Sequence, residues 1–134
     1  MSQSLGRVLV VDDEPDDLEA LRLALASSGF EVITATDGKS ALEKSQAYSA
    51  RFDLLVTDIA MSPMNGYDVA IACAKLNPKL KVVFVSGHVG AHSLQYHGDL
   101  VIGNWTFVRK PFTREGLIVK IQQLLDGVLT QHAW

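Results

Sequence analysis

The stretch Leu54-Leu55-Val56-Thr57-Asp58 decides the fold of this chain. It is a short apolar run that ends on one carboxylate. Such a run suits a strand buried on both faces of a parallel sheet. Asp58 would then lie at the carboxyl edge of the sheet, where open α/β sheets bind ligands because the loops beyond the strands leave a crevice. The rest of the chain can be interpreted as placing side chains around this acid.

Three other apolar runs also end on polar side chains. They are Val8–Val11, which ends on Asp12, Asp13 and Glu14; Val82–Val85, which ends on Ser86; and Trp105–Arg109, which ends on Lys110. If the strands are parallel, their carboxyl ends meet at one edge of the sheet. We therefore expect an acid pair, a hydroxyl and an amine near Asp58.

Strand and helix patterns alternate along the chain. The residue pattern predicts strands at Gly6–Val11, Glu31–Ala35, Leu54–Thr57, Val82–Val85 and Thr106–Arg109, and helices at Asp16–Ser28, Lys39–Ala50, Tyr67–Leu76 and Thr113–Leu129. This alternation predicts a doubly wound, five-stranded parallel α/β sheet. The glycine-rich segment Gly87–Asn104 predicts an irregular or shortened fourth helix, because glycine is costly inside a helix.

Composition limits the class of protein. With 134 residues, of which 48% are hydrophobic, the chain suits one domain, predicted over residues 6–129 with tails at 1–5 and 130–134. A net charge of −3 and a pI near 5.7 argue against direct nucleic-acid binding. The apolar runs are too short to cross a bilayer, the amino terminus has no signal-peptide pattern, and the one cysteine, Cys73, cannot form an internal disulfide. These features predict a cytoplasmic protein.

Three carboxylates at one edge need a counter-ion. Asp12, Asp13 and Asp58 would repel one another and resist ionisation when brought together. Hard oxygen ligands select Mg²⁺, which accepts one or two carboxylates together with phosphate oxygens. Such an ion, with a lysine opposite, would neutralise a phosphoryl group during transfer. A carboxylate can itself be the nucleophile and form an aspartyl phosphate.

Five short motifs carry a family resemblance. They are VLVVDDEP at Val8–Pro15, LLVTDIAM at Leu54–Met61, MNG at Met64–Gly66, VFVSG at Val83–Gly87 and FVRKPF at Phe107–Phe112. In this order, each near a predicted strand end, they resemble the response-regulator receiver domain, the phosphoacceptor half of a two-component signalling pair. The resemblance covers roughly residues 6–127 and implies a flavodoxin-like (βα)5 fold.

The resemblance also implies roles for individual residues. It implies that Asp58 is phosphorylated and that Mg²⁺ is held by Asp13, Asp58 and the Ala60 carbonyl, with Asp12 acting through water. Ser86 and Lys110 would hold the phosphoryl oxygens, and Phe107 would be the aromatic residue that turns inward when Ser86 moves. The Lys110-Pro111 bond is usually cis in this family. The implied partners are a sensor histidine kinase or histidine phosphotransfer protein and a downstream output protein or domain, and a phosphorylation-dependent homodimer is left open.

Two other functions remain as alternatives. One is a Mg²⁺-dependent phosphohydrolase with an aspartyl nucleophile, but such enzymes usually carry a second acid two residues after the nucleophile, where this chain has Ala60. The other is an interaction domain that keeps the fold without being phosphorylated, and the acids, Ser86 and Lys110 argue against it. The receiver would be either a stand-alone protein or part of a larger regulator or hybrid kinase.

Overall fold

The computed structural model describes residues 5–48, 51–87 and 104–127. Within these ranges the chain forms one parallel sheet of five strands in the order β2-β1-β3-β4-β5. The strands are β1 (Arg7–Val11), β2 (Glu31–Ala35), β3 (Leu54–Asp58), β4 (Lys81–Ser86) and β5 (Asn104–Arg109). The strand that ends on Asp58 is therefore the central one, as its uniformly apolar sequence requires.

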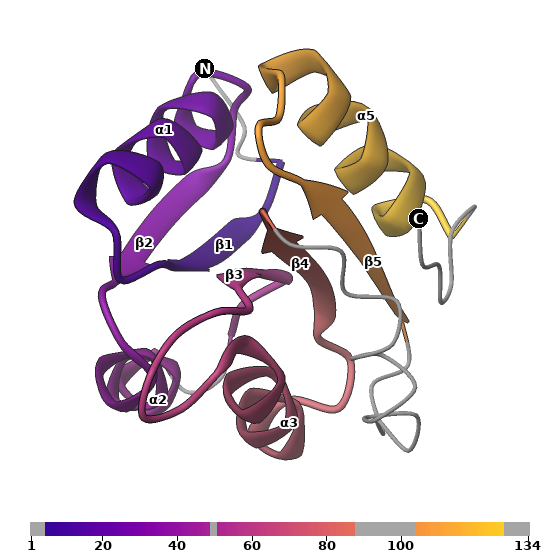
Figure 1. Ribbon diagram of the computed structural model, residues 1–134. Coiled ribbons are helices and arrows are strands. Elements are labelled where there is room, and N and C mark those ends of the chain that lie inside the picture. Colours follow the sequence, from indigo (N-terminus) through magenta and orange to yellow (C-terminus); the bar gives the residue numbers. More distant parts are fainter. Residues whose placement is uncertain (1–4, 49–50, 88–103, 128–134) are drawn as a thin grey trace.

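Helices cover both faces of the sheet (Figure 1). One face carries α1 (Pro15–Ala26) and α5 (Arg114–Leu125), and the other carries α2 (Gly38–Ala47) and α3 (Gly66–Leu76). Alternate residues of β1 serve the two cores: Val8 and Val10 pack towards α1 and α5, whereas Leu9 and Val11 pack towards α2 and α3. Because both faces are buried, the strands contain apolar runs in place of a polar alternation.

Residues at the starts of three helices suit the backbone conformation or hydrogen bonding needed there. Pro15 begins α1, where its missing N–H costs little. The Asn65 side chain accepts from the Asp68 N–H, and the Asp68 carboxylate accepts from the Asn65 N–H. These two hydrogen bonds form a capping box at the start of α3. The Thr113 hydroxyl accepts from the Gly116 N–H at 3.0 Å and so caps the start of α5.

The predicted sheet and its helices are confirmed, with boundaries that move by at most three residues where they can be compared. The prediction for a fourth helix falls on residues 88–103, which lie outside the described residues, as does the end of the predicted last helix. The last strand was predicted to begin at Thr106, whereas β5 begins two residues earlier, at Asn104. Pairing of β5 with β4 places Trp105 beside Val82 and leaves it 8% exposed in the core.

The connection from β3 to α3 depends on a glycine. The Gly66 N–H donates to the Ile59 carbonyl at 2.9 Å, which folds the start of α3 back onto the end of β3. A Cβ atom on Gly66 would lie only 2.2 Å from the Asp58 carbonyl oxygen. The backbone that carries Asp58 is therefore fixed by an approach that only glycine permits.

No helix in the described part of the chain has the length and apolar character needed to cross a bilayer.

Candidate functional site

Three acids meet at the carboxyl edge of the sheet. Asp12 and Asp13 follow β1 directly, and Asp58 ends the neighbouring strand β3, whose Thr57 pairs with Val11. One carboxylate oxygen from each acid lies within 4.8 Å of the others. Asp12 and Asp58 are buried, whereas Asp13 is exposed. The cluster is thus open to solvent on one side only.

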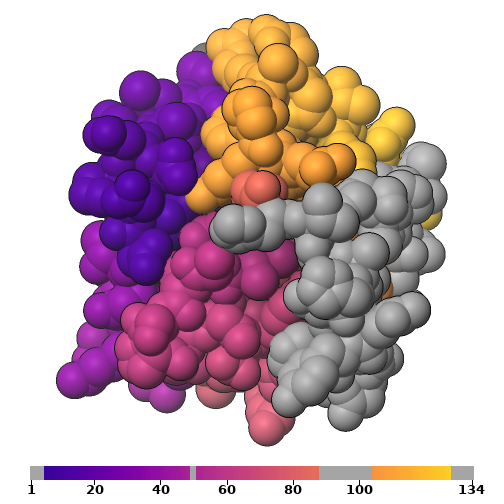
Figure 2. Space-filling model, viewed as in Figure 1, coloured from indigo at the N-terminus to yellow at the C-terminus, as the bar shows by residue number. Residues whose placement is uncertain are grey.

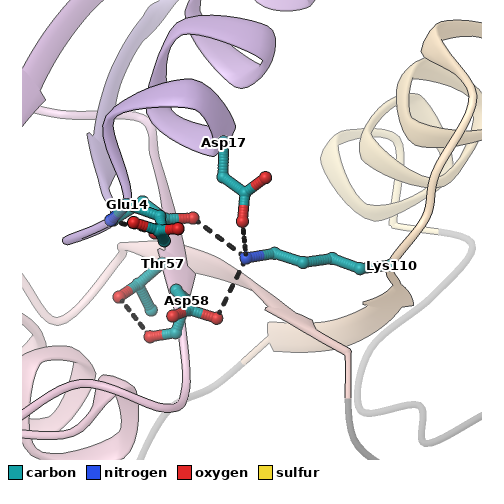
Figure 3. A network of polar contacts seen from close by, with 6 residues as sticks. Glu14, Asp17, Thr57, Asp58 and Lys110 are labelled. Atoms are coloured by element: carbon teal, nitrogen blue, oxygen red, sulfur yellow. Dashed lines mark hydrogen bonds and ion pairs between the residues drawn. The ribbon is translucent and has the colours of Figure 1, made fainter.

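Lys110 points into this cluster from the end of β5 (Figure 3). Its Nζ atom lies 3.1 Å from Asp12 Oδ2, 2.8 Å from Asp17 Oδ2 and 3.4 Å from Asp58 Oδ1. The Lys110-Pro111 peptide bond is cis. The Lys110 N–H also donates to the Ser86 carbonyl at 2.8 Å, so the chain leaving β5 stays hydrogen-bonded to the end of β4.

Burial and mutual repulsion set the charge balance of the site. Burial raises the pKa of Asp12, although the Glu14 N–H at 2.9 Å and Lys110 oppose this rise. Burial and the neighbouring Asp12 charge raise the pKa of Asp58. Burial lowers the pKa of Lys110, but its bonds to Asp17 and Asp12 outweigh burial and raise it above its ordinary value. Lys110 therefore stays charged, and the buried acids favour additional positive charge.

Ser86 and Phe107 lie on the neighbouring strands β4 and β5, two positions apart in register. Ser86 is the last residue of β4, is 3% exposed and pairs in register with Arg109. Phe107 is 1% exposed, with its ring centroid 5.3 Å from that of Phe84 and 5.5 Å from that of Trp105. Figure 2 shows salmon-coloured atoms at the surface between the magenta and orange parts of the chain, and Gly87, directly after β4, is exposed. Phe107 is packed inside the core in this structure.

One residue of the site was missed by sequence reasoning. Asp17 was not predicted as a site residue, yet its carboxylate is the nearest of the three around Lys110. No local sequence signal indicated this contact, because it depends on how the first turn of α1 lies relative to Lys110. By contrast, Ala60 lies two residues beyond Asp58 in an exposed loop, and its role as a carbonyl ligand stays a prediction.

Comparison with known families identifies the family and the fold of this chain. The family model described as response regulator receiver domain matches residues 8–122. The chain belongs to this family. The match begins in β1 and ends in α5, so it includes every strand end that contributes to the acid cluster of the receiver. The proposed resemblance and the flavodoxin-like fold are both confirmed.

Individual relatives agree with this assignment. The receiver is 29% identical over 128 residues to the response regulator SaeR of Staphylococcus aureus; the alignment covers 96% of this chain and 54% of SaeR, so the chain spans about half of that relative. Chemotaxis response regulator CheY4 of Vibrio cholerae has a TM-score of 0.79 and 28% identity, with 90% of this chain and 99% of that chain covered. Response regulator TrrA of Thermotoga maritima, solved in complex with Mg²⁺-BeF, has a TM-score of 0.74 and 31% sequence identity. The match covers 92% of this chain and 99% of TrrA.

The acid cluster suits the receiver family. A receiver domain is the phosphoacceptor module of two-component signalling, and Asp12, Asp13 and Asp58 form an acidic pocket that fits a phosphoacceptor site. The cluster also offers only hard carboxylate oxygens from this chain, the donors that Mg²⁺ prefers. The raised pKa values of Asp12 and Asp58 show that Lys110 alone does not fully compensate the buried acids. The residues present therefore fit a divalent cation.

Proposed function

We propose that this receiver takes a phosphoryl group from a phosphohistidine donor onto Asp58. An Asp58 carboxylate oxygen forms a bond to phosphorus while the phosphorus–nitrogen bond of the donor breaks. The imidazole nitrogen keeps the electron pair of that bond and can then take up a proton. The observation that carries the proposal is the convergence of a buried Asp58, two further acids and the Lys110 ammonium at one sheet edge.

Lys110 and Ser86 would hold the phosphoryl oxygens. The Lys110 amine already lies 3.4 Å from Asp58 Oδ1, on the side from which it can meet a group added to that oxygen. Ser86 ends the strand next to β3, with Val85 paired in register with Asp58. A charged donor and a hydroxyl beside the acceptor would stabilise the negative charge of the phosphoryl group as it transfers.

Asp12, Asp13, Asp58 and the Ala60 carbonyl would hold Mg²⁺. When bound, the ion would supply positive charge that neutralises the phosphoryl oxygens. Asp58 would thus serve both as nucleophile and as ligand. We expect the protein to assist its own phosphorylation and dephosphorylation without acting as a turnover enzyme.

Phosphorylation would be transmitted through Ser86 and Phe107. Movement of the Ser86 hydroxyl towards the phosphoryl group would free space beside Phe107, whose ring already packs between Phe84 and Trp105. The surface that includes β5 and α5 would then change. We expect a sensor histidine kinase or histidine phosphotransfer protein to donate the phosphoryl group. We expect a downstream output protein or domain to respond to the change in this surface. A cytoplasmic location suits a chain whose one cysteine is a free, buried thiol.

Incubation with a small acyl phosphate and Mg²⁺, followed by intact mass measurement, tests the proposal. We expect one phosphoryl group per chain, lost in Asp58→Asn and retained in Asp126→Asn, which removes an exposed acid at the end of α5. Steady release of phosphate without an adduct would favour the phosphohydrolase. Absence of both adduct and phosphate release would favour the inert interaction domain.

A further inference from the structure

Lys110 is shared by three carboxylates, and the nearest does not belong to the acceptor. Its Nζ atom lies 2.8 Å from Asp17, 3.1 Å from Asp12 and 3.4 Å from Asp58. A lysine ammonium has three N–H donors, and two of them already donate to Asp17 and Asp12, whereas the contact with Asp58 is an ion pair. A phosphoryl oxygen on Asp58 would therefore compete for an ammonium that Asp17 and Asp12 already hold.

Asp17 can release the Lys110 ammonium more easily than Asp12 can. Asp12 is fully buried and also accepts from the Glu14 N–H, whereas the Asp17 side chain is 45% exposed and can be solvated by water. Asp17 also lies in the first turn of α1, where the helix dipole favours its charge without a lysine. Figure 3 shows Asp17 and Asp58 approaching the Lys110 amine from different elements.

We propose that Asp17 is a positioning residue that competes with the phosphoryl group for Lys110 and so weakens the affinity of the site for that group. This inference rests on the proposed function. In the unphosphorylated receiver Asp17 draws the amine towards α1, and on phosphorylation the amine exchanges Asp17 for a phosphoryl oxygen.

The test is a titration with beryllofluoride, an analogue of the phosphoryl group, at saturating Mg²⁺, followed by calorimetry. Asp17→Asn removes the competing charge while keeping the side-chain size. A partly exposed ion pair contributes about 0.2–1 kcal/mol, so the dissociation constant should fall by about 1.4- to fivefold. Asp16→Asn is the matched control, because it removes an exposed neighbouring charge of the same helix turn and Asp16 has no ion pair with Lys110 among the described contacts.

A second measurement uses the protein without Mg²⁺ or beryllofluoride. The ε-methylene NMR resonance of Lys110 should shift in Asp17→Asn and stay in place in Asp16→Asn, which a purely structural effect on α1 would not produce. Equal affinities in the two variants, or weaker binding in Asp17→Asn, would overturn the inference while the proposed function stands. Failure of the wild-type receiver to bind beryllofluoride with Mg²⁺ would instead overturn the proposed function, and this inference with it.

Discussion

The carboxylates of Asp12 and Asp58 are buried side by side, and burial raises the pKa of both. Lys110 supplies one positive charge to this pair and is held by a third acid, Asp17. A buried charge that is incompletely paired destabilises the folded state. The acid cluster therefore lowers the free energy of unfolding in the absence of a cation. Such a loss is expected where function requires several carboxylates close together.

Removal of the Asp58 charge should stabilise the metal-free protein at neutral pH. Because the folded pKa of Asp58 is raised, its proton binds more tightly in the folded than in the unfolded chain, and ionisation at pH 7 favours unfolding. Asp58→Asn should raise the free energy of unfolding at pH 7 by on the order of 1 kcal/mol, the usual size of a single-residue effect. Urea unfolding in EDTA measures this difference.

The same series at lower pH provides the internal control. The gain in Asp58→Asn should shrink as pH falls through the raised pKa and vanish below about pH 4, where Asp58 is protonated in both states. An Asp58→Asn variant that is less stable than the wild type at pH 7 in EDTA would contradict this account of the site.

Cys73 should behave as an inert core thiol. It is 2% exposed, and burial raises its pKa to about 11 despite an opposing bond with Ser45. Relative to an ordinary thiol, its thiolate fraction at pH 8 is roughly a hundredfold lower, since each pKa unit is tenfold. A disulfide reagent should label Cys73 slowly in the native protein and rapidly in urea. Fast stoichiometric labelling of the native chain would show that the thiol is accessible.

Most site residues could be predicted from the sequence because each follows an apolar strand. Asp12, Asp58, Ser86 and Lys110 are placed by strand ends, and parallel strands end at one edge. Asp17 could not be assigned in this way, because its contact with Lys110 depends on how the first turn of α1 lies over that edge. Such an orientation follows from packing between elements distant in the chain and has no local sequence signal.

At the scale of elements, the β3–α3 connection fixes the acceptor. The Gly66 N–H binds the Ile59 carbonyl, and the Gly66 backbone passes so close to the Asp58 carbonyl that a Cβ would lie 2.2 Å from it. Contacts this short force the backbone to move. The position of the Asp58 side chain thus depends on a residue that contributes no functional group.

Gly66→Ala should therefore disturb both stability and the site. We expect a loss of about 1–3 kcal/mol in the free energy of unfolding, as for other overpacked positions, together with weaker Mg²⁺ binding. Gly116→Ala is the control in the first turn of α5, where a Cβ would meet only the end of the Thr113 side chain at 3.0 Å. Urea unfolding and Mg²⁺ titration measure the two effects, and equal behaviour of both variants would refute the assigned role of Gly66.

Strand β5 illustrates where sequence reasoning fails at this scale. Trp105 directly follows the glycine-rich segment Gly87–Asn104, and the predicted strand began only at Thr106. In the sheet, Trp105 packs its ring against Phe84 and Phe107, with centroid distances of 6.4 and 5.5 Å. Burial against two neighbouring rings extends β5 to Asn104, and this tertiary contribution outweighs the local turn preference.

At the scale of the whole molecule, strand order brings the site together. Adjacent β1 and β3 bring Asp12, Asp13 and Asp58 to the centre of the sheet edge, and β4 and β5 add Ser86 and Lys110 from one side. The alternation of strand and helix patterns predicted a parallel sheet, because crossover helices need such spacing. The motif resemblance then supplied the strand order through the fold that it implies.

Mg²⁺ should stabilise the whole domain by binding the folded state. At a Mg²⁺ concentration of about one hundred times the dissociation constant, the gain in unfolding free energy is about 2.7 kcal/mol for a single site. Thermal unfolding with and without EDTA measures this gain. It should be lost in Asp13→Asn, whose exposed side chain contributes to the cluster, and kept in Asp16→Asn. An undiminished gain in Asp13→Asn would place the ion elsewhere.

The most direct test of the central claim is to locate the phosphoryl group chemically. Reduction of the phosphorylated receiver with borohydride converts an aspartyl phosphate to homoserine, and peptide mass spectrometry then identifies the converted position. The account predicts conversion at Asp58 alone, dependent on both Mg²⁺ and the phosphodonor. Conversion at Asp12, Asp13 or Asp17, or a stable phosphoryl group on a hydroxyl or imidazole side chain, would contradict it.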